Sequence, residues 1–304
     1  MNVHRQLLFV VFVAMLMLLG CKNNITHSAS YGKAYEVVVI NDIDSLLYNT
    51  LSVPMKGLPQ IEPTFDVVEI TSDKLKGDSK LVRNIVVLTI DKRQKRVDIS
   101  SKQNVYAQPQ VIINIVAPSQ SSLQIFLKKY GNELRNYLIK TELHRAQGDI
   151  ARQTNVKAAS TIYKMFGIRM QVPPELTTSK VGKNFLWLSN NASSGMVNLC
   201  IYSIGKGKFA QERDSVMRKN ILGERKGMYM RTASIVSMVH GKYNSVTIRG
   251  LWEMQNDAMG GPFVAYWKPN GKRIVVTEVF VYAPETKKRN LVRRLEAALY
   301  TRNK

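Results

Sequence analysis

The sequence predicts an α+β fold of two linked α/β-type halves, each a largely antiparallel or mixed sheet closed by a C-terminal amphipathic helix. Apolar, strand-like runs recur along the chain and are separated by Gly, Pro, Asn and Asp. Each half ends with a strand, an Ala-Pro step and a helix of three- and four-residue apolar spacing, at Ala117-Pro118 and again at Ala283-Pro284. A length of 304 residues suits about two domains of modest size.

Composition and pattern divide the chain into five segments. The second segment, at 21–33, is polar and has no apolar periodicity, which is typical of a flexible tether. We expect a signal peptide at 1–20, this tether at 21–33, an N-terminal α/β half at 34–147, a connecting helix at 148–165 and a C-terminal α+β half at 166–304.

The N-terminal half combines buried strands with helices. The runs AYEVVVIN, FDVVEI, NIVVLTI and QVIINIVAP are typical of strands, and LPQIEP is a proline-rich loop. Asp42 or Asp44 is placed to cap a short helix in DIDSLLYNTL. From Ser119 the period changes, which predicts a long helix that is bent or broken near Gly148. Its apolar positions are Leu123, Phe126, Leu127, Tyr130, Leu134, Tyr137 and Leu138.

The C-terminal half is expected to hold strands and two helices. The strand runs are FLWLS, GMVNLCIYSI, YNSVTIRGLWEMQ, PFVAYW and KRIVVTEVFVYAP, and the helices are KFAQERDSVMRKNIL and KRNLVRRLEAALY. Asn270-Gly271 between two apolar alternations is the strongest short signal of a β-hairpin. Cys200 lies inside an apolar strand run, so a buried and unreactive thiol is expected there.

The first twenty residues predict export. Arg5 precedes an unbroken apolar stretch from Leu7 to Leu19, whose 13 residues are too few for a membrane-spanning helix. The sequence LLGC that ends at Cys21 resembles a bacterial lipobox, which implies cleavage before Cys21 and acylation of its thiol and amino group. An ordinary secretory signal with a chance cysteine and an uncleaved anchor are the alternatives.

The resemblance to a lipobox also implies a location. Two or more acyl chains hold a protein firmly at a membrane, because each buried methylene contributes about 0.8 kcal/mol. Lys22 follows the cysteine, at the position where lipoproteins kept at the inner membrane carry Asp. We therefore expect a protein of the outer membrane that faces the periplasm.

The formal net charge of +22 favours anionic partners. Basic residues are spread along the chain, with clusters at 91–96 and 287–294. In the cell envelope such partners are an anionic glycan, lipid head groups or another envelope protein. Nucleic acid is not expected, since no nucleic-acid-binding motif accompanies the charge. A charged surface that only keeps the protein soluble is the other interpretation.

Several motifs resemble one known family. The sequences FLWLS, RDSV, RGLWEMQNDAMGGPFVAY, VFVYAP and KRNLVRRLEAALY resemble the domain-of-unknown-function 4837 family of envelope lipoproteins of Bacteroidota. LPQIEPTFDV and YAQPQVIINIVAPS extend the resemblance into the first half, so that it covers almost the whole chain after the signal. The resemblance implies an envelope lipoprotein, and it implies no activity, cofactor or catalytic residue.

The residues themselves contain no recognised catalytic, cofactor-binding or metal-binding motif. His144 and His240 have no Cys, His or carboxylate at metal-ligand spacing and are expected at the surface. SIGK, at 203–206, has the Ser-x-x-Lys spacing of some acyl-enzymes but lacks their partner motifs. GKGK, at 205–208, is followed by Phe209 rather than Ser or Thr, which favours a basic loop over a phosphate-binding loop.

One candidate ligand-contact loop lies within RGLWEMQNDAMGGPFVAYW. On a helix, Glu253 and Asp257 would share a face as paired carboxylates suited to acid–base chemistry. The apolar alternation that ends at Trp252 and Met254 favours a strand instead, followed by a loop that holds Asp257. A structural turn and a ligand-contact loop both remain possible for Trp252, Asp257, Met259, Gly260 and Gly261.

These observations favour a lipid-anchored envelope protein of unknown molecular activity that binds or scaffolds. The alternative is an envelope hydrolase with a non-standard active site. Under the alternative, Glu253 or Asp257 should face a pocket, whereas under the first interpretation both should be solvated residues beside a turn.

The lipid anchor gives the first testable prediction. Replacement of Cys21 with Ala removes the acylated thiol, so the protein should leave the membrane fraction and should no longer incorporate labelled fatty acid. Cell fractionation and acyl labelling measure both outcomes. Unchanged membrane association without label in either protein would contradict acylation of Cys21.

Overall fold

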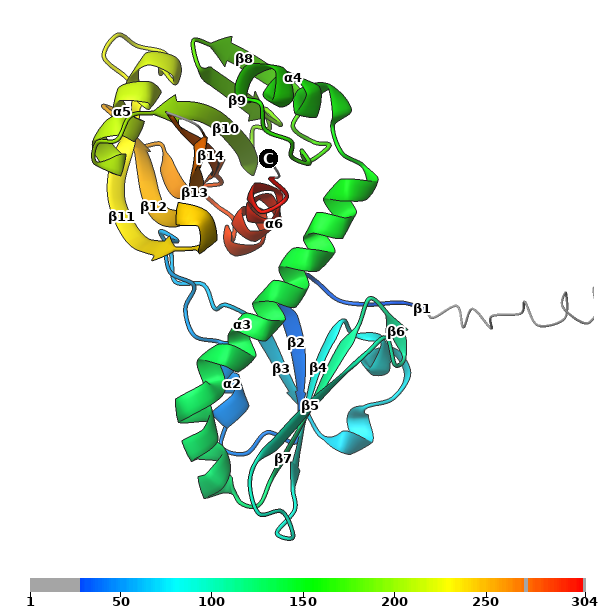
Figure 1. Cartoon of the computed structure of the whole chain (residues 1–304). Coiled ribbons are helices and arrows are strands. Elements are labelled where there is room, and N and C mark those ends of the chain that lie inside the picture. The colour runs from blue at the N-terminus through cyan, green and yellow to red at the C-terminus, as the bar shows by residue number, and fades with distance from the viewer. Residues whose placement is uncertain (1–27, 271–272, 303–304) are drawn as a thin grey trace, which may run out of the picture.

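A computed structural model describes residues 28–270 and 273–302 of the chain, so the predicted signal peptide and Cys21 lie outside the described residues. The described chain forms two lobes (Figure 1), which we call the N-lobe, residues 28–152, and the C-lobe, residues 153–302. The long helix α3 (Gln120–Arg152) runs along the N-lobe sheet and reaches the C-lobe beside α6 (Arg289–Leu299). None of the described helices, α3 included, has both the length and the apolar character of a membrane span.

The N-lobe is a mixed sheet with helices on one face. Asp42 caps α2 (Leu46–Leu51), since its carboxylate accepts hydrogen bonds from the backbone N–H groups of Leu47 and Tyr48 at 3.0 and 2.8 Å. The helices α2 and α3 cover the face that presents Val37 and Val39. In spatial order the strands are β3 (Asp66–Ile70), β2 (Glu36–Ile40), β4 (Asn84–Ile90), β7 (Val111–Ala117) and β5 (Asp98–Gln103).

Strand directions in this sheet make β5 an exception. The first four strands run parallel, and β5 pairs antiparallel to β7 at the edge. Every residue of β5 is exposed. A separate two-stranded pair joins β1 (Ser28–Ala29), the first described residues, to β6 (Ala107–Gln108).

The C-lobe is an antiparallel sheet of seven strands covered on both faces. One cluster of buried residues lies under α5 (Phe209–Asn220), and a second lies under α4 (Val156–Phe166) and α6. The spatial order is β11 (Met230–His240), β12 (Val246–Met254), β13 (Gly260–Asn270), β14 (Arg273–Tyr282), β10 (Met196–Ile204), β9 (Phe185–Ser189) and β8 (Thr178–Gly182).

The predicted α+β architecture of two halves is confirmed, and the differences lie at edges and at the connection. The strands β5, β8 and β11 are mostly exposed and have no apolar alternation to identify them. The helix α3 passes through Gly148 without a break and ends at Arg152. Asn155 then caps α4 by accepting the backbone N–H of Ala158, so 148–165 is not one connecting helix but two helix segments with a short turn between them.

The loop between α2 and β3 joins the lobes. It carries Met55 into the buried cluster under α6. The carboxylate of Glu62, which is buried, accepts the backbone N–H groups of Lys288 and Arg289 at 2.7 and 3.0 Å and so caps the first turn of α6. The Arg289 guanidinium returns to the N-lobe, where it donates to Asp66 at 2.6 Å.

A second ionic cluster is buried beside α6. The carboxylate of Glu296 has no exposed surface, and it pairs with Arg249 of β12 and with Arg293, and accepts a hydrogen bond from Tyr300 at 2.7 Å. Burial alone would raise the pKa of Glu296, but the two guanidinium groups outweigh burial and lower this pKa to about 2. The carboxylate is therefore ionised across the physiological pH range.

Replacement of Glu296 with Gln should lower the free energy of unfolding at neutral pH by about 3–5 kcal/mol, because Arg249 and Arg293 lose their counter-charge in a buried site. The folded pKa of Glu296 lies below its ordinary value of 4.5, so its contribution is present above that pH and is lost as the pH falls toward 2. Urea unfolding as a function of pH measures both effects.

The matched control is Glu253→Gln, which breaks an exposed pair with Arg231 and should cost less than about 1 kcal/mol. Equal decreases in the free energy of unfolding for the two variants would contradict the role assigned to Glu296. The same would hold if Glu296→Gln lost as much stability as the parent chain when the pH falls from 4.5 toward 2.

Candidate functional site

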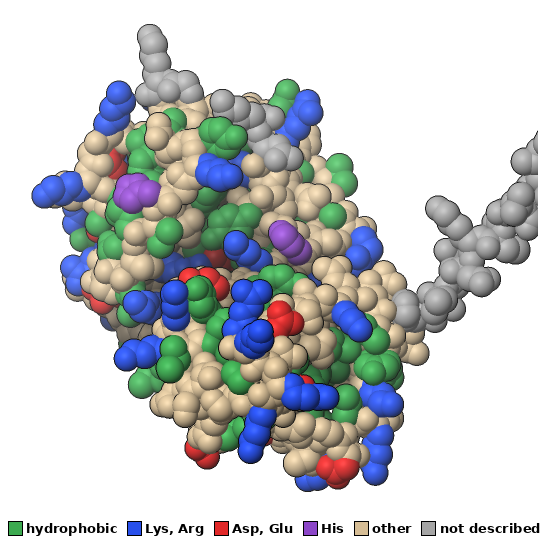
Figure 2. Space-filling view, turned by 60° about the horizontal axis from the view of Figure 1, so that its bottom comes forward, with side chains coloured by type: hydrophobic (Ala, Val, Ile, Leu, Met, Phe, Trp, Pro, Cys, Tyr) green, Lys and Arg blue, Asp and Glu red, His purple; other side chains and the backbone are tan. Residues whose placement is uncertain are grey.

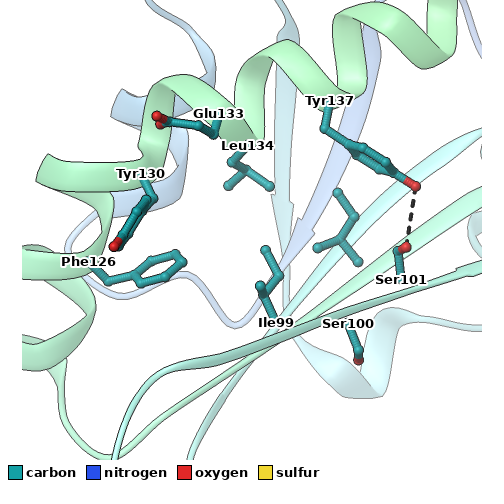
Figure 3. Close-up of a pocket in the computed structure, with 9 residues that line it drawn as sticks. Ile99, Ser100, Ser101, Phe126, Tyr130, Glu133, Leu134 and Tyr137 are labelled. Atoms are coloured by element: carbon teal, nitrogen blue, oxygen red, sulfur yellow. Dashed lines mark hydrogen bonds between the residues drawn. The ribbon is translucent and has the colours of Figure 1, made fainter.

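An apolar pocket of the N-lobe lies between the edge strand β5 and α3. It has a volume of about 400 Å³. Figure 3 shows Phe126, Tyr130 and Leu134 of α3 on one side, and Ile99 of β5 opposite them. The pocket exists because β5 lies one strand beyond the part of the sheet that α3 covers. We call it the apolar section; its lining residues are Ile99, Ser100, Ser101, Ile113, Phe126, Tyr130, Glu133, Leu134 and Tyr137.

A hydrogen bond closes one end of the apolar section. The hydroxyl groups of Tyr137 and Ser101 lie 3.3 Å apart and bridge α3 to β5 (Figure 3). Both side chains are exposed, so the bridge is accessible to solvent and contributes little to stability.

A polar pocket of about 710 Å³ continues along the same elements beyond this bridge. On α3 its lining begins at Thr141, one turn after Tyr137, and on β5 it begins at Gln103. We call it the polar section and the two together the α3 groove. The polar section is lined by Ser30, Arg83, Gln103, Asn104, Gln108, Pro109, Gln110, Val111, Thr141, His144, Arg145, Gly148, Asp149 and Arg152.

Two arginines in the polar section are held by one buried carboxylate. Glu142 pairs with Arg83 at 3.1 Å and with Arg145 at 2.6 Å, and it accepts a hydrogen bond from Asn84 at 2.8 Å. Burial lowers the pKa of Arg145, although Glu142 opposes the shift. The Nε atom of Arg83 is buried and has no partner among the described residues.

The balance of charge makes the polar section mildly cationic. Arg152 is paired with Asp149, and Glu142 neutralises one of the two remaining arginines. One guanidinium charge is therefore left over, beside the imidazole of His144 and the exposed amides of Gln103 and Gln108. This arrangement can hold an anionic or strongly polar group through charge-assisted hydrogen bonds.

Sequence reasoning did not find the α3 groove, although one signal for it was present. Seven apolar residues of α3 form two stripes rather than one. Leu123, Leu127, Leu134 and Leu138 are buried against the sheet, whereas Tyr130 and Tyr137 remain exposed and Phe126 is partly buried. A helix with a second, half-exposed aromatic stripe indicates a surface that is not filled by the core.

The predicted ligand-contact loop lies elsewhere, in the hairpin of β12 and β13. Trp252 is 3% exposed, packs edge-on against Phe280 at 5.4 Å between ring centroids, and donates its indole N–H to the carbonyl of Val281. A Cβ atom at Gly261 would lie 2.1 Å from that carbonyl oxygen. These residues close the sheet by close approach of strands, and they line neither section of the α3 groove.

The two carboxylates of this hairpin do not converge. Glu253 pairs with Arg231 of the neighbouring strand at the surface. Asp257 is exposed and accepts the backbone N–H of Ala258 at 2.6 Å within the turn. The positions match the arrangement expected of a structural turn; a ligand contact by the loop stays a prediction.

One ionic interaction of the C-lobe core is fully enclosed. Arg213 of α5 and Glu278 of β14 have no exposed surface and form an ion pair at 2.7 Å, and Tyr202 donates to the same carboxylate at 2.6 Å. Burial raises the pKa of the Cys200 thiol well above its ordinary value, and Glu278 adds to the shift. Cys200 is therefore buried and unreactive, as its sequence position predicts.

The two histidines in the described part of the chain occupy exposed positions. His144 lines the polar section and His240 ends β11. Within residues 28–270 and 273–302, no three His, Cys, Asp or Glu side chains are close enough together to hold a metal ion.

Comparison with known families matches the two lobes separately. Residues 155–301 match the family described as Domain of unknown function (DUF4837), which confirms the resemblance for the C-lobe. Residues 30–151 match a different family, Domain of unknown function (DUF8532), so the motifs of the first half do not extend the first family over the whole chain. The boundary between the two matches coincides with the turn between α3 and α4. No curated protein matches the chain.

Replacement of Gly261 with Ala should cost about 2–3 kcal/mol of folding free energy, because the new methyl group would overlap the carbonyl oxygen of Val281. Thermal and urea unfolding measure the loss.

The control is Gly148→Ala in α3, where the nearest atom to the new Cβ would be 3.8 Å away and helix propensity should add about 1 kcal/mol of stability. A Gly261→Ala protein as stable as wild type would show that the hairpin does not require this close approach.

Proposed function

We propose that this protein is a binding module of the cell envelope, anchored through acylated Cys21, whose α3 groove holds an amphiphilic ligand. The apolar chain of the ligand occupies the apolar section, and its anionic or strongly polar head occupies the polar section. The proposal concerns binding, and it assigns no reaction to the groove.

The observation that carries this proposal is the change of chemistry along one groove. From Phe126 to Tyr137 the wall is aromatic and aliphatic, and over these eleven helical steps a helix rises about 16 Å. From Thr141 to Arg152 the same helix presents polar and cationic groups. A ligand that matches both parts must join an apolar chain to a polar head, because burial of either half against the wrong section costs free energy.

The predicted anchor supports a ligand drawn from the membrane surface. The strand β1 pairs with β6, and Ser30, Gln108 and Pro109 beside this pair line the polar section. Ser28 lies seven positions after Cys21, and seven extended steps span at most about 25 Å. Acylation of Cys21 would therefore keep the polar section within reach of lipid head groups.

The distribution of charge supports an anionic environment. Residues 153–304 contain 25 Lys and Arg but 9 Asp and Glu, whereas residues 28–152 contain 17 and 13. Figure 2 shows Lys and Arg side chains scattered over both lobes on one face, without a single dense patch. Such a field holds the protein near a polyanionic surface without defining a binding site, and the groove then supplies the specificity.

Replacement of Ile99 with Asp should weaken the binding of dodecyl phosphate at least about tenfold, because a carboxylate would face the apolar section and repel an anionic amphiphile. Isothermal titration calorimetry on the non-acylated Cys21→Ala chain measures the affinity.

The matched control is Val68→Asp. Val68 lies on β3, at the opposite edge of the same sheet. The side chains of Val68 and Ile99 are exposed to almost the same extent, 45% and 44%. Binding to Val68→Asp should stay within about twofold of the parent chain. Equal affinities for the Ile99→Asp and parent chains, or equal losses in both variants, would exclude the groove as the site.

A further inference from the structure

A second pocket, of about 560 Å³, lies in the C-lobe at the end of the sheet where α5 begins. The turn between β10 and α5 supplies Lys206 and Gly207. Both belong to the basic segment GKGK, which lacks the following Ser or Thr of a phosphate-binding loop. The pocket is remote from the α3 groove, since no residue lines both. Its lining is Ile204, Lys206, Gly207, Phe209, Met238, Trp267, Pro269, Arg273 and Ile274.

The walls of this pocket are apolar and its charged side chains are cationic. Six of the lining residues have hydrocarbon, thioether or aromatic side chains, and none of the described residues that line it is acidic. Lys206 and Arg273 are both exposed. Glu212 of α5 does not line the pocket, but its carboxylate accepts the backbone N–H of Gly205 at 3.0 Å and lies beside Gly207 of the lining.

One hydrogen-bond donor of the lining has no protein acceptor. The indole Nε1 of Trp267 is buried and has no partner among the described residues. A buried donor of this kind costs free energy unless an acceptor reaches it. The helix α5 begins at the lining residue Phe209; its N-cap residue, Lys208, makes no side-chain cap hydrogen bond, and Glu212 is the acidic residue of its first turn.

Strand β11 contributes Met238 to the pocket. Its pairing with β12 shifts register twice, between Thr232 and Ser234 and again between Ile235 and Ser237, and such irregularities bend an edge strand. Beyond the second shift Met238 lines the pocket while it remains 47% exposed. A flexible thioether at the opening suits apolar ligands of varied shape.

From this combination we propose that the C-lobe pocket binds an apolar carboxylate, such as a medium-chain fatty acid. The hydrocarbon part packs against Ile204, Phe209 and Ile274. The carboxylate accepts hydrogen bonds from the indole of Trp267 and pairs with Lys206 and Arg273. The inference is independent of the α3 groove, because it rests on different residues in the other lobe.

The test follows the indole N–H signal of Trp267 by ¹⁵N NMR in the non-acylated Cys21→Ala chain. A Trp267→Phe variant identifies the signal by its loss. Titration with octanoate should shift this signal in a saturable way, and octan-1-ol, which has the same chain without the charge, should bind at least about tenfold more weakly. Equal effects of the acid and the alcohol would overturn the proposal, as would an unchanged signal with octanoate.

Charge variants distinguish a specific binding site from nonspecific electrostatic attraction. A chain with both Lys206→Gln and Arg273→Gln should bind octanoate at least about tenfold more weakly. The control, Lys219→Gln with Arg225→Gln, removes two exposed charges elsewhere on the C-lobe and should leave the affinity within about twofold. Equal losses in the two double variants would overturn the proposal.

The proposals for the α3 groove and for the C-lobe pocket can be tested separately. Ile99→Asp should leave the octanoate shift of Trp267 unchanged, since Ile99 lies in the N-lobe. Loss of the Trp267 response in Ile99→Asp would assign the binding to the α3 groove and would overturn a separate C-lobe site. Conversely, loss of dodecyl phosphate binding in Ile99→Asp with an intact octanoate response would support both sites.

Discussion

The buried contact between Glu62 and the amino terminus of α6 fixes how the two lobes meet. One carboxylate from an N-lobe loop accepts two backbone N–H groups that a helix otherwise leaves unsatisfied. Because the site is buried, separation of the lobes would break this contact and expose both the carboxylate and the helix end to water. The return contact from Arg289 to Asp66 makes the junction reciprocal. The α3 groove and the C-lobe pocket are therefore held in one molecule at opposite sides of a satisfied polar interface.

Charge inside the molecule is arranged differently from charge at its surface. In the interior each buried guanidinium has a carboxylate partner, as in the pairs of Arg213 with Glu278 and Arg249 with Glu296. Each of those pairs is neutral, so the net charge of +22 comes from the remaining Lys and Arg, most of which are exposed. The basic surface favours an anionic environment, in agreement with the proposed ligands of both pockets.

The family motif that first suggested a functional loop has a structural explanation. Its tryptophan and glycines allow β12, β13 and β14 to approach closely, and its acidic residues point to solvent or to a neighbouring strand. Sequence reasoning located the strands on either side of this loop because their apolar alternation reflects burial. It missed β5, with its sequence DISSKQ, because an edge strand with both faces exposed has no apolar pattern. The α3 groove depends on that strand, so the groove was missed with it.

The sequence by itself determined the fold class, most buried strands and most of the helices, since each of these follows from local periodicity and capping, as at Asp42. It also determined the expectation of a lipid anchor at Cys21, which lies outside the described residues. Only the tertiary structure decided which side chains share a pocket. Ile99 and Phe126 are 27 positions apart, and Lys206 and Arg273 are 67 apart, yet each pair lines one cavity. The proximity of such distant residues depends on strand order and helix packing, which local sequence patterns do not encode.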